Sequence, residues 1–188
     1  MLRKWVKKFH FFFTPLFWLH DNIISDVVAY TPTWIGDLIR KLYIKIMSQQ
    51  CGRAFIAHTG VQIFYPWNLV IGQNVSISRN TIINANKKII LANNVMIGPN
   101  CNIMTANHGY SLKHIPMNQQ YSNANELYIN EDVWIGNGVV ISAGARSINI
   151  AKGIIIAANS VVTKSLEEEY GIYGGVPARL IKKRFDNN

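Results

Sequence analysis

The chain has 188 residues, of which 49% are hydrophobic and 15% are charged, with a formal net charge of +9. This length suits one ordinary domain with its own core, and the composition excludes a disordered chain and a disulfide-stapled miniprotein. The most apolar run, residues 9–19, contains His10, Thr14 and Pro15 and is shorter than the roughly 20 residues of a membrane span. No small-x-small cleavage site follows it, and two cysteines form no disulfide framework, so a cytoplasmic location is expected.

The positive charge forms three clusters rather than one stripe. These clusters lie within residues 3–8, 40–45 and 179–184, and no acidic residue occurs between Leu38 and Asn125. Basic patches suit anionic membranes and phosphorylated cofactors as well as nucleic acids, so charge alone does not identify the partner. Because there is no single basic stripe, we expect no nucleic-acid partner.

Residues 1–20 combine cations with aromatic rings. Arg3, Lys4, Lys7 and Lys8 precede Phe9, Phe11, Phe12, Phe13, Phe17 and Trp18. Cations followed by aromatic residues are typical of a segment that contacts an anionic membrane surface. The alternative is that these rings pack on the fold or on a neighbouring subunit.

A helix is predicted over Thr33–Met47, where apolar residues recur at helical spacing. The stripe consists of Ile35, Leu38, Ile39, Leu42 and Ile46. Thr33 is the expected cap, and the cations at 40, 41 and 45 suit the carboxyl end of the helix dipole. We expect this helix to close the open end of the repeat that follows, with the stripe serving a structural role.

From about residue 51 the chain has a six-residue period, which fits neither an α-helix nor a simple alternating strand. Such a chain makes a short strand, turns and repeats, so that three hexads close one coil of a triangular prism and coils stack about 4.8 Å apart. Asn74, Asn80, Asn94 and Asn100 suit left-handed corners. A β-sandwich with accidental spacing is the alternative. The aliphatic anchors are Ile71, Ile77, Ile83 and Ile89; Leu91, Ile97 and Ile103; Ile129, Ile135 and Ile141; and Ile150, Ile156 and Val162.

Several motifs make the pattern specific: Val95–Asn100 (VMIGPN), Val133–Gly136 (VWIG), Ala157–Lys164 (AANSVVTK) and Gly175–Arg179 (GVPAR). They resemble the hexapeptide-repeat acyltransferases, above all the maltose, galactoside, xenobiotic and surface-polysaccharide acetyltransferases. The resemblance implies an all-β fold, a left-handed parallel β-helix, and a homotrimer. It divides the chain into an N-terminal segment (1–50), a β-helix (51–166) and a C-terminal tail with a short helix (167–188). The sequence departs from the family at Ala157–Asn159, where Gly-Ala-Gly is common, and in extra residues after Ile89 and after Ile141.

An insertion at residues 107–126 breaks the repeat and opens with Asn107-His108. In the family resembled, a histidine at this position is the general base at a subunit junction, and an imidazole can accept a proton from a hydroxyl near neutral pH. His108 is therefore the predicted base. Tyr110 and His114 on the insertion, and Asn84 one to two coils earlier, are candidate acceptor contacts, although Asn84 equally suits a left-handed corner. Glu126 either orients the ring of His108 or is a solvated loop acid.

The same resemblance implies acetyl-CoA as the donor, bound between neighbouring prisms, and no metal. The implied donor contacts are Trp134 and Asn137 at the thioester and pantetheine arm, the backbone at Ala158, and Thr163, Lys164, Arg179 and Lys182 at the phosphates. Lysine and arginine suit phosphate because their hydrogen bonds to it are charge-assisted.

The predicted activity is direct acetyl transfer to a sugar hydroxyl, in a bacterial surface polysaccharide or its precursor. A small free sugar and an antibiotic hydroxyl are alternative acceptors. Cys101 is expected at an inward or corner position, which disfavours an acetyl-cysteine intermediate. Two other classes use the same solenoid: a zinc carbonic anhydrase, disfavoured because His58 lies coils away from His108 and His114, and a non-catalytic scaffold.

Overall fold

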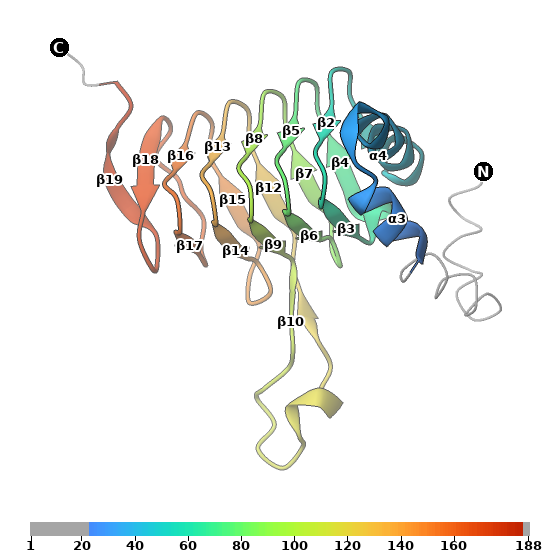
Figure 1. The fold of residues 1–188 in the computed structure, drawn as a ribbon. Helices are drawn as coiled ribbons and strands as arrows, with labels where there is room; N and C mark the ends of the chain where they lie inside the picture. Colours follow the sequence, from blue (N-terminus) through green and yellow to red (C-terminus); the bar gives the residue numbers. More distant parts are fainter. Residues whose placement is uncertain (1–22, 186–188) are drawn as a thin grey trace.

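The computed structural model describes residues 23–185, and it forms a prism of three parallel sheets with helices at one end and a hairpin at the other (Figure 1). The basic, aromatic segment predicted at residues 1–20 lies outside the described residues. The first face contains β1 (Gln50–Cys51), β4 (Leu69–Ile71), β7 (Ile89–Leu91), β12 (Leu127–Ile129) and β15 (Ile148–Ile150).

The second and third faces repeat this arrangement. The second face contains β2 (Ile56–Ala57), β5 (Ser76–Ile77), β8 (Met96–Ile97), β13 (Trp134–Ile135) and β16 (Ile155–Ile156), followed by β18 (Gly171–Gly174) and β19 (Arg179–Lys183). The third face contains β3 (Gln62–Phe64), β6 (Ile82–Asn84), β9 (Asn102–Met104), β14 (Val140–Ser142) and β17 (Val161–Val162).

The strand register confirms the predicted hexads. On the first face Cys51 pairs with Ile71, Ile71 with Leu91, Leu91 with Ile129, and Ile129 with Ile150. Each anchor therefore lies above the equivalent anchor of the previous coil, as a chain that turns after every short strand requires. The result is the left-handed parallel β-helix that the sequence predicted.

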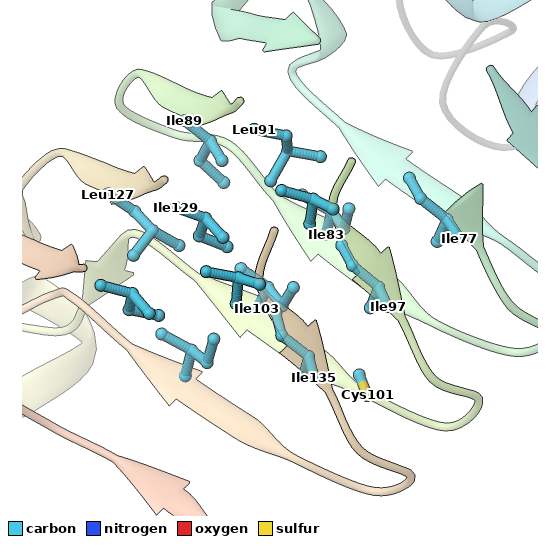
Figure 2. Packing of buried hydrophobic residues seen from close by; sticks show 14 of the residues in the cluster. Ile77, Ile83, Ile89, Leu91, Ile97, Cys101, Ile103, Leu127, Ile129 and Ile135 are labelled. Atoms are coloured by element: carbon cyan, nitrogen blue, oxygen red, sulfur yellow. The ribbon is translucent and has the colours of Figure 1, made fainter. Parts of the chain in front are cut away.

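The prism interior is a continuous stack of aliphatic side chains (Figure 2). Ile77, Ile97 and Ile135 stack on the second face with at most 1% of their surface exposed. On the first face each strand from β4 onward buries its first and third residues, as Ile89 and Leu91 do. This double burial explains why the hexad frame shifts after Ile89: both residues belong to one strand.

The corners use asparagine as predicted. Asn74, Asn80, Asn94 and Asn100 have φ between 54° and 59°, the left-handed region that asparagine tolerates. Their side chains also connect successive coils, since Asn74 Nδ2 donates to Asn94 Oδ1 at 3.0 Å. The corners are thus held by side-chain hydrogen bonds in addition to the backbone ladders.

Two helices close the amino-terminal end, α3 (Ser25–Tyr30) and α4 (Thr33–Met47). The bounds of α4 are those predicted, but its orientation is not: Gly36, Arg40 and Ile44 are buried, whereas the apolar stripe faces outward. The N-cap is Pro32, with no side-chain cap, so the prediction of Thr33 as the cap is wrong. The stripe is exposed because the guanidinium of Arg40, not the aliphatic side chains, is inserted between the helices and the first coil.

The carboxyl-terminal end is a hairpin. Strand β18 pairs in parallel with β16, and β19 returns antiparallel to β18. The short helix predicted within 167–188 is therefore wrong for the described residues, because the exposed edge of β18 is covered by a strand instead.

The remaining elements are the 3₁₀ turns η2 (Pro66–Asn68) and η3 (Met117–Gln119) and the antiparallel pair β10 (Ala106–Asn107) and β11 (Asn123–Ala124). This pair forms the base of the insertion, called the arm below (residues 106–124), which projects away from the prism (Figure 1). Within residues 23–185 no helix has the length and hydropathy that a bilayer crossing requires.

Candidate active site

The base of the arm is fixed to the next coil. Asn107 Oδ1 accepts a hydrogen bond from Ser142 Oγ at 3.3 Å, and Asn125 Nδ2 donates to the Gly144 carbonyl at 2.8 Å. The two segments touch so closely that a Cβ on Gly144 would lie 2.4 Å from Asn107 Cγ. The backbone that carries His108 is therefore held rigidly even though the arm beyond it is exposed.

His108 follows β10 directly, and its side chain is exposed. Throughout residues 23–185 the structure gives this imidazole no hydrogen-bond partner, so a substrate hydroxyl could approach it. Tyr110 and His114 lie farther out on the arm and are exposed as well.

Asn84 lies one coil before the arm, at the last position of β6. Its carbonyl accepts the backbone N–H of Thr105 at 3.1 Å, which places it beside the chain entering the arm. Its side-chain Oδ1 is buried and has no hydrogen-bond partner among the described residues. Asn84 does not have the positive φ of the corner asparagines, so the corner interpretation of this residue is wrong.

Three corners on successive coils place His108 in line with two cations. The arm, residues 143–147 and residues 163–165 each lead from the third face back to the first. His108, Arg146 and Lys164 therefore occupy one long edge of the prism, called the arm edge below, on coils about 4.8 Å apart. Arg146 and Lys164 are exposed and make no hydrogen bond or ion pair with other residues of the described range.

A cavity of about 520 Å³ opens on this edge. Because three of its lining residues are Arg146, Lys164 and Arg179, it suits an anionic ligand such as a phosphate. Thr163 is exposed directly before Lys164, whereas Lys182 lies on β19 and does not line the cavity. The sequence analysis did not predict Arg146. This residue lies between Ile141 and Ile150, a spacing three residues longer than a hexad, and that longer spacing is the signal that could have identified it. The full lining is Arg146, Lys164, Ser165, Leu166, Glu167, Tyr173, Ala178, Arg179 and Leu180.

The other predicted donor contacts lie elsewhere on the prism. Trp134 projects from β13 between Met96 and Ile155 and is 48% exposed. Asn137 and Ala158 occupy the corners between the second and third faces on successive coils, called the tryptophan corner below together with Trp134. Apart from Lys182, the predicted donor contacts thus lie on two separate edges of the prism.

Glu126 follows the arm and makes no hydrogen bond with His108. Its carboxylate accepts a hydrogen bond from the hydroxyl of Tyr128. This bond raises the pKa of Tyr128, because ionising the phenol would both break the bond and place two negative charges together.

The residues named for the competing chemistries lie apart. His58 belongs to the first coil, where its Nδ1 is 3.6 Å from Asp37 Oδ2, and residues 23–185 contain no cluster of three metal-ligating side chains. Cys101 is fully buried, as predicted, and its Sγ donates to the Gly136 carbonyl at 3.1 Å. Burial raises the pKa of this thiol, which opposes a role as a nucleophile.

The chain resembles known acetyltransferases over most of its length. It is 33% identical over 140 residues to a putative acetyltransferase of Saccharomyces cerevisiae. The aligned residues cover 74% of this chain and 68% of that protein. It is 30% identical over 152 residues to a galactoside O-acetyltransferase of Lactococcus lactis, covering 81% and 69%. A solved structure of galactoside acetyltransferase in complex with coenzyme A superposes with a TM-score of 0.77 at 25% identity, covering 92% and 87%. No family model matches the chain.

The coiled prism, the asparagine corners and the arm histidine define a left-handed β-helix of the hexapeptide-repeat type. Together with relatives that align over two thirds of their length, they assign the chain to a family. The chain belongs to the hexapeptide-repeat acetyltransferases, and it is an acetyltransferase.

Proposed function

We propose that this protein transfers the acetyl group of acetyl-CoA to a hydroxyl of a saccharide, at sites shared between neighbouring copies in a homotrimer. One observation carries the proposal: His108 and the cationic cavity lie on the arm edge, whereas Trp134, Asn137 and Ala158 lie on the tryptophan corner. A donor with phosphates at one end and a thioester at the other needs both sets, and two adjacent prisms can present them to one groove.

The residues of the arm edge have distinct roles in this proposal. Arg146, Lys164 and Arg179 hold the donor phosphates through charge-assisted hydrogen bonds. The imidazole of His108 accepts the proton of the acceptor hydroxyl as its oxygen attacks the thioester carbonyl. The C–S bond then breaks, and the CoA sulfur takes that proton from His108, which leaves a thiol and an acetyl ester. Backbone N–H groups stabilise the oxyanion during the transfer.

The acceptor is a saccharide in this proposal because aligned relatives are galactoside O-acetyltransferases. Tyr110 and His114 on the arm supply a ring and a hydrogen-bonding group, and the unpartnered Oδ1 of Asn84 supplies an acceptor beside the arm. A surface polysaccharide or its precursor remains the proposed physiological acceptor, and a lipid-linked form of it fits if residues 1–20 contact a membrane. Free sugars and antibiotic hydroxyls are the competing acceptors.

The activity is tested by CoA thiol release and mass spectrometry across nucleotide sugars, oligosaccharides, lipid-linked saccharides and antibiotics. We expect His108→Ala to lower kcat by about 10²–10⁴ while CoA affinity stays nearly unchanged. His58→Ala is the matched control, because this histidine lies in the first coil away from the arm. Full turnover by His108→Ala would contradict the role of the base, and absence of transfer to every acceptor would contradict the proposed reaction.

The shared site is tested by mixing subunits. Homotrimers of His108→Ala and of Trp134→Ala each lack one half of every site. In randomly mixed trimers about one interface in four combines the intact arm edge of one variant with the intact tryptophan corner of the other. Activity should recover toward a quarter of the unmodified level. Mixing without recovery, with mixed trimers detected by mass spectrometry, would show that one chain holds the whole site.

A further inference from the structure

Helix α4 carries an apolar surface on the side that faces away from the prism. The exposed fractions are 73% for Trp34, 51% for Leu42 and 75% for Ile46. The opposite side of the helix holds Arg40 and Ile44, both buried against the first coil. We call this surface the outer face of α4, and it consists of Trp34, Ile35, Leu38, Leu42 and Ile46.

The buried side of α4 anchors the helix to the rest of the molecule. The guanidinium of Arg40 donates to the carbonyls of Ala57 at 2.9 Å and Ala29 at 3.0 Å, which joins α4 to the first coil and to α3. Helix α3 packs beside α4 and exposes Val27, and Ile23 before it is exposed as well. A contiguous exposed apolar surface of this kind marks an interaction site.

The charges around the outer face are positive. Lys41 and Lys45 are exposed on the same helix. The two acids of this region are engaged: Asp37 pairs with Arg40 at 2.6 Å, and Asp26 accepts a hydrogen bond from Gln62 at 3.1 Å. Apolar side chains with tryptophan at one end and lysines alongside are the composition of a helix that lies in a membrane interface.

We propose that the outer face of α4 docks on an anionic lipid bilayer, with its apolar side chains among the acyl chains and Lys41 and Lys45 at the headgroups. Charge complementarity favours this occupant over a second copy, since two copies of α4 would bring four lysines into one interface, and the one carboxylate of α4, Asp37, already pairs with Arg40. The chain before Ile23 has 22 residues, with four cations and one acid in its sequence, and it joins the molecule at this same end. The cations of that segment therefore add to the attraction of Lys41 and Lys45 to anionic lipid.

The test is cosedimentation of the full-length protein with phosphatidylcholine vesicles made with and without phosphatidylserine. We expect binding to the anionic vesicles, and about tenfold weaker binding by Leu42→Glu, which puts a carboxylate at the centre of the outer face. Lys41→Gln/Lys45→Gln should weaken binding to anionic vesicles roughly thirtyfold, the effect of removing two cations, and leave binding to neutral vesicles unchanged. The matched control is Ile181→Glu, because Ile181 is 63% exposed on β19 at the opposite end of the solenoid.

Circular dichroism should show all variants folded, since every changed side chain is exposed. Three results would overturn the proposal. The first is that the full-length protein fails to bind anionic vesicles. The second is that Leu42→Glu binds them as tightly as the unmodified protein; stronger binding after deletion of residues 1–22 would then show that this segment covers the face. A lower oligomeric mass for Leu42→Glu in light scattering would show that the face joins copies of the chain.

Discussion

The two ends of the solenoid are closed by different chemistry. At the amino-terminal end α4 is fixed by one arginine, Arg40, which has no exposed surface and donates to carbonyls of α3, of the loop after it and of β2. At the carboxyl-terminal end the β18–β19 hairpin covers the last coil and borders a cavity with exposed cations, among them Arg146 and Arg179. Arginine thus appears in two environments in one small fold.

The difference teaches how environment decides the role of a cation. The hydrogen-bonding groups of Arg40 are taken by backbone carbonyls and by the carboxylate of Asp37, so it has nothing left for a ligand. Arg146 has no such partner within residues 23–185, and its charge is directed to a cavity. A saturated, buried guanidinium supports the fold, whereas an unsatisfied, exposed one is available to phosphate.

The largest effect is expected at the buried arginine. Arg40→Met removes the guanidinium, takes the donor from the buried carbonyl of Ala57 and from the partly buried carbonyls of Val28 and Thr31, and leaves Asp37 without its partner. We expect the free energy of unfolding to fall by about 2–3 kcal/mol, because a buried carbonyl loses its hydrogen bond while Asp37 is partly exposed and can be solvated. Urea denaturation followed by circular dichroism measures this loss.

Lys41→Met is the matched control for Arg40, since it removes a cation from the next position of α4 where the side chain is exposed. Its effect should stay within about 0.5 kcal/mol. Equal effects of the two substitutions would mean that burial does not separate the roles of the two cations.

A smaller effect is expected at the cavity. Arg146→Ala should raise the KM for acetyl-CoA about tenfold, with kcat within about twofold, because it removes one charge-assisted hydrogen bond to a donor phosphate. Steady-state kinetics with acetyl-CoA and with acetyl-dephospho-CoA measure this change. If Arg146 contacts the 3′-phosphate, the difference between the two donors should shrink in the variant.

Arg53→Ala provides the comparison for Arg146, because Arg53 is an exposed arginine of the first coil, at the opposite end of the solenoid. Its kinetics should match those of the unmodified protein. Donor KM unchanged in Arg146→Ala would remove the cavity from the donor site.

The prism could be predicted from the sequence because its rule is local. Each anchor, such as Ile97 or Ile135, needs only to be aliphatic and six residues from the next, and the parallel stack follows from that spacing. The corner asparagines are equally local, since a left-handed φ depends on the residue itself. The position of His108 at the start of the arm followed from the point where the period breaks.

The caps could not be predicted in the same way because they depend on tertiary contacts. Periodicity located α4 but placed its apolar stripe inward, since hydrophobicity gives no signal that Arg40 can occupy the buried side when carbonyls of other segments surround it. The tail contains no periodic signal that distinguishes a strand from a helix. It forms strand β19 because the free edge of β18 offers backbone groups for pairing. The separation of the donor contacts onto two edges depends on which corner each residue enters, which motif matching does not reveal.

The smallest effect is expected for the alkylation rates of the two cysteines, which depend on how well the surrounding coils bury each thiol. Cys101 is fully buried in a middle coil, whereas Cys51 is half-buried on β1, where it packs against the core beneath α4 with Tyr43. Burial raises the pKa of both thiols, and at Cys51 the nearby Lys45 and Lys41 oppose that rise. A raised pKa leaves less thiolate at a given pH, and access is lower at Cys101, so iodoacetamide should modify Cys51 severalfold faster. Peptide mass spectrometry after timed quenching measures both rates.

Arg40→Met should accelerate the labelling of Cys51 and leave Cys101 unchanged if the substitution loosens only the amino-terminal cap. Equal acceleration at both positions would mean that the cap and the middle coils unfold together.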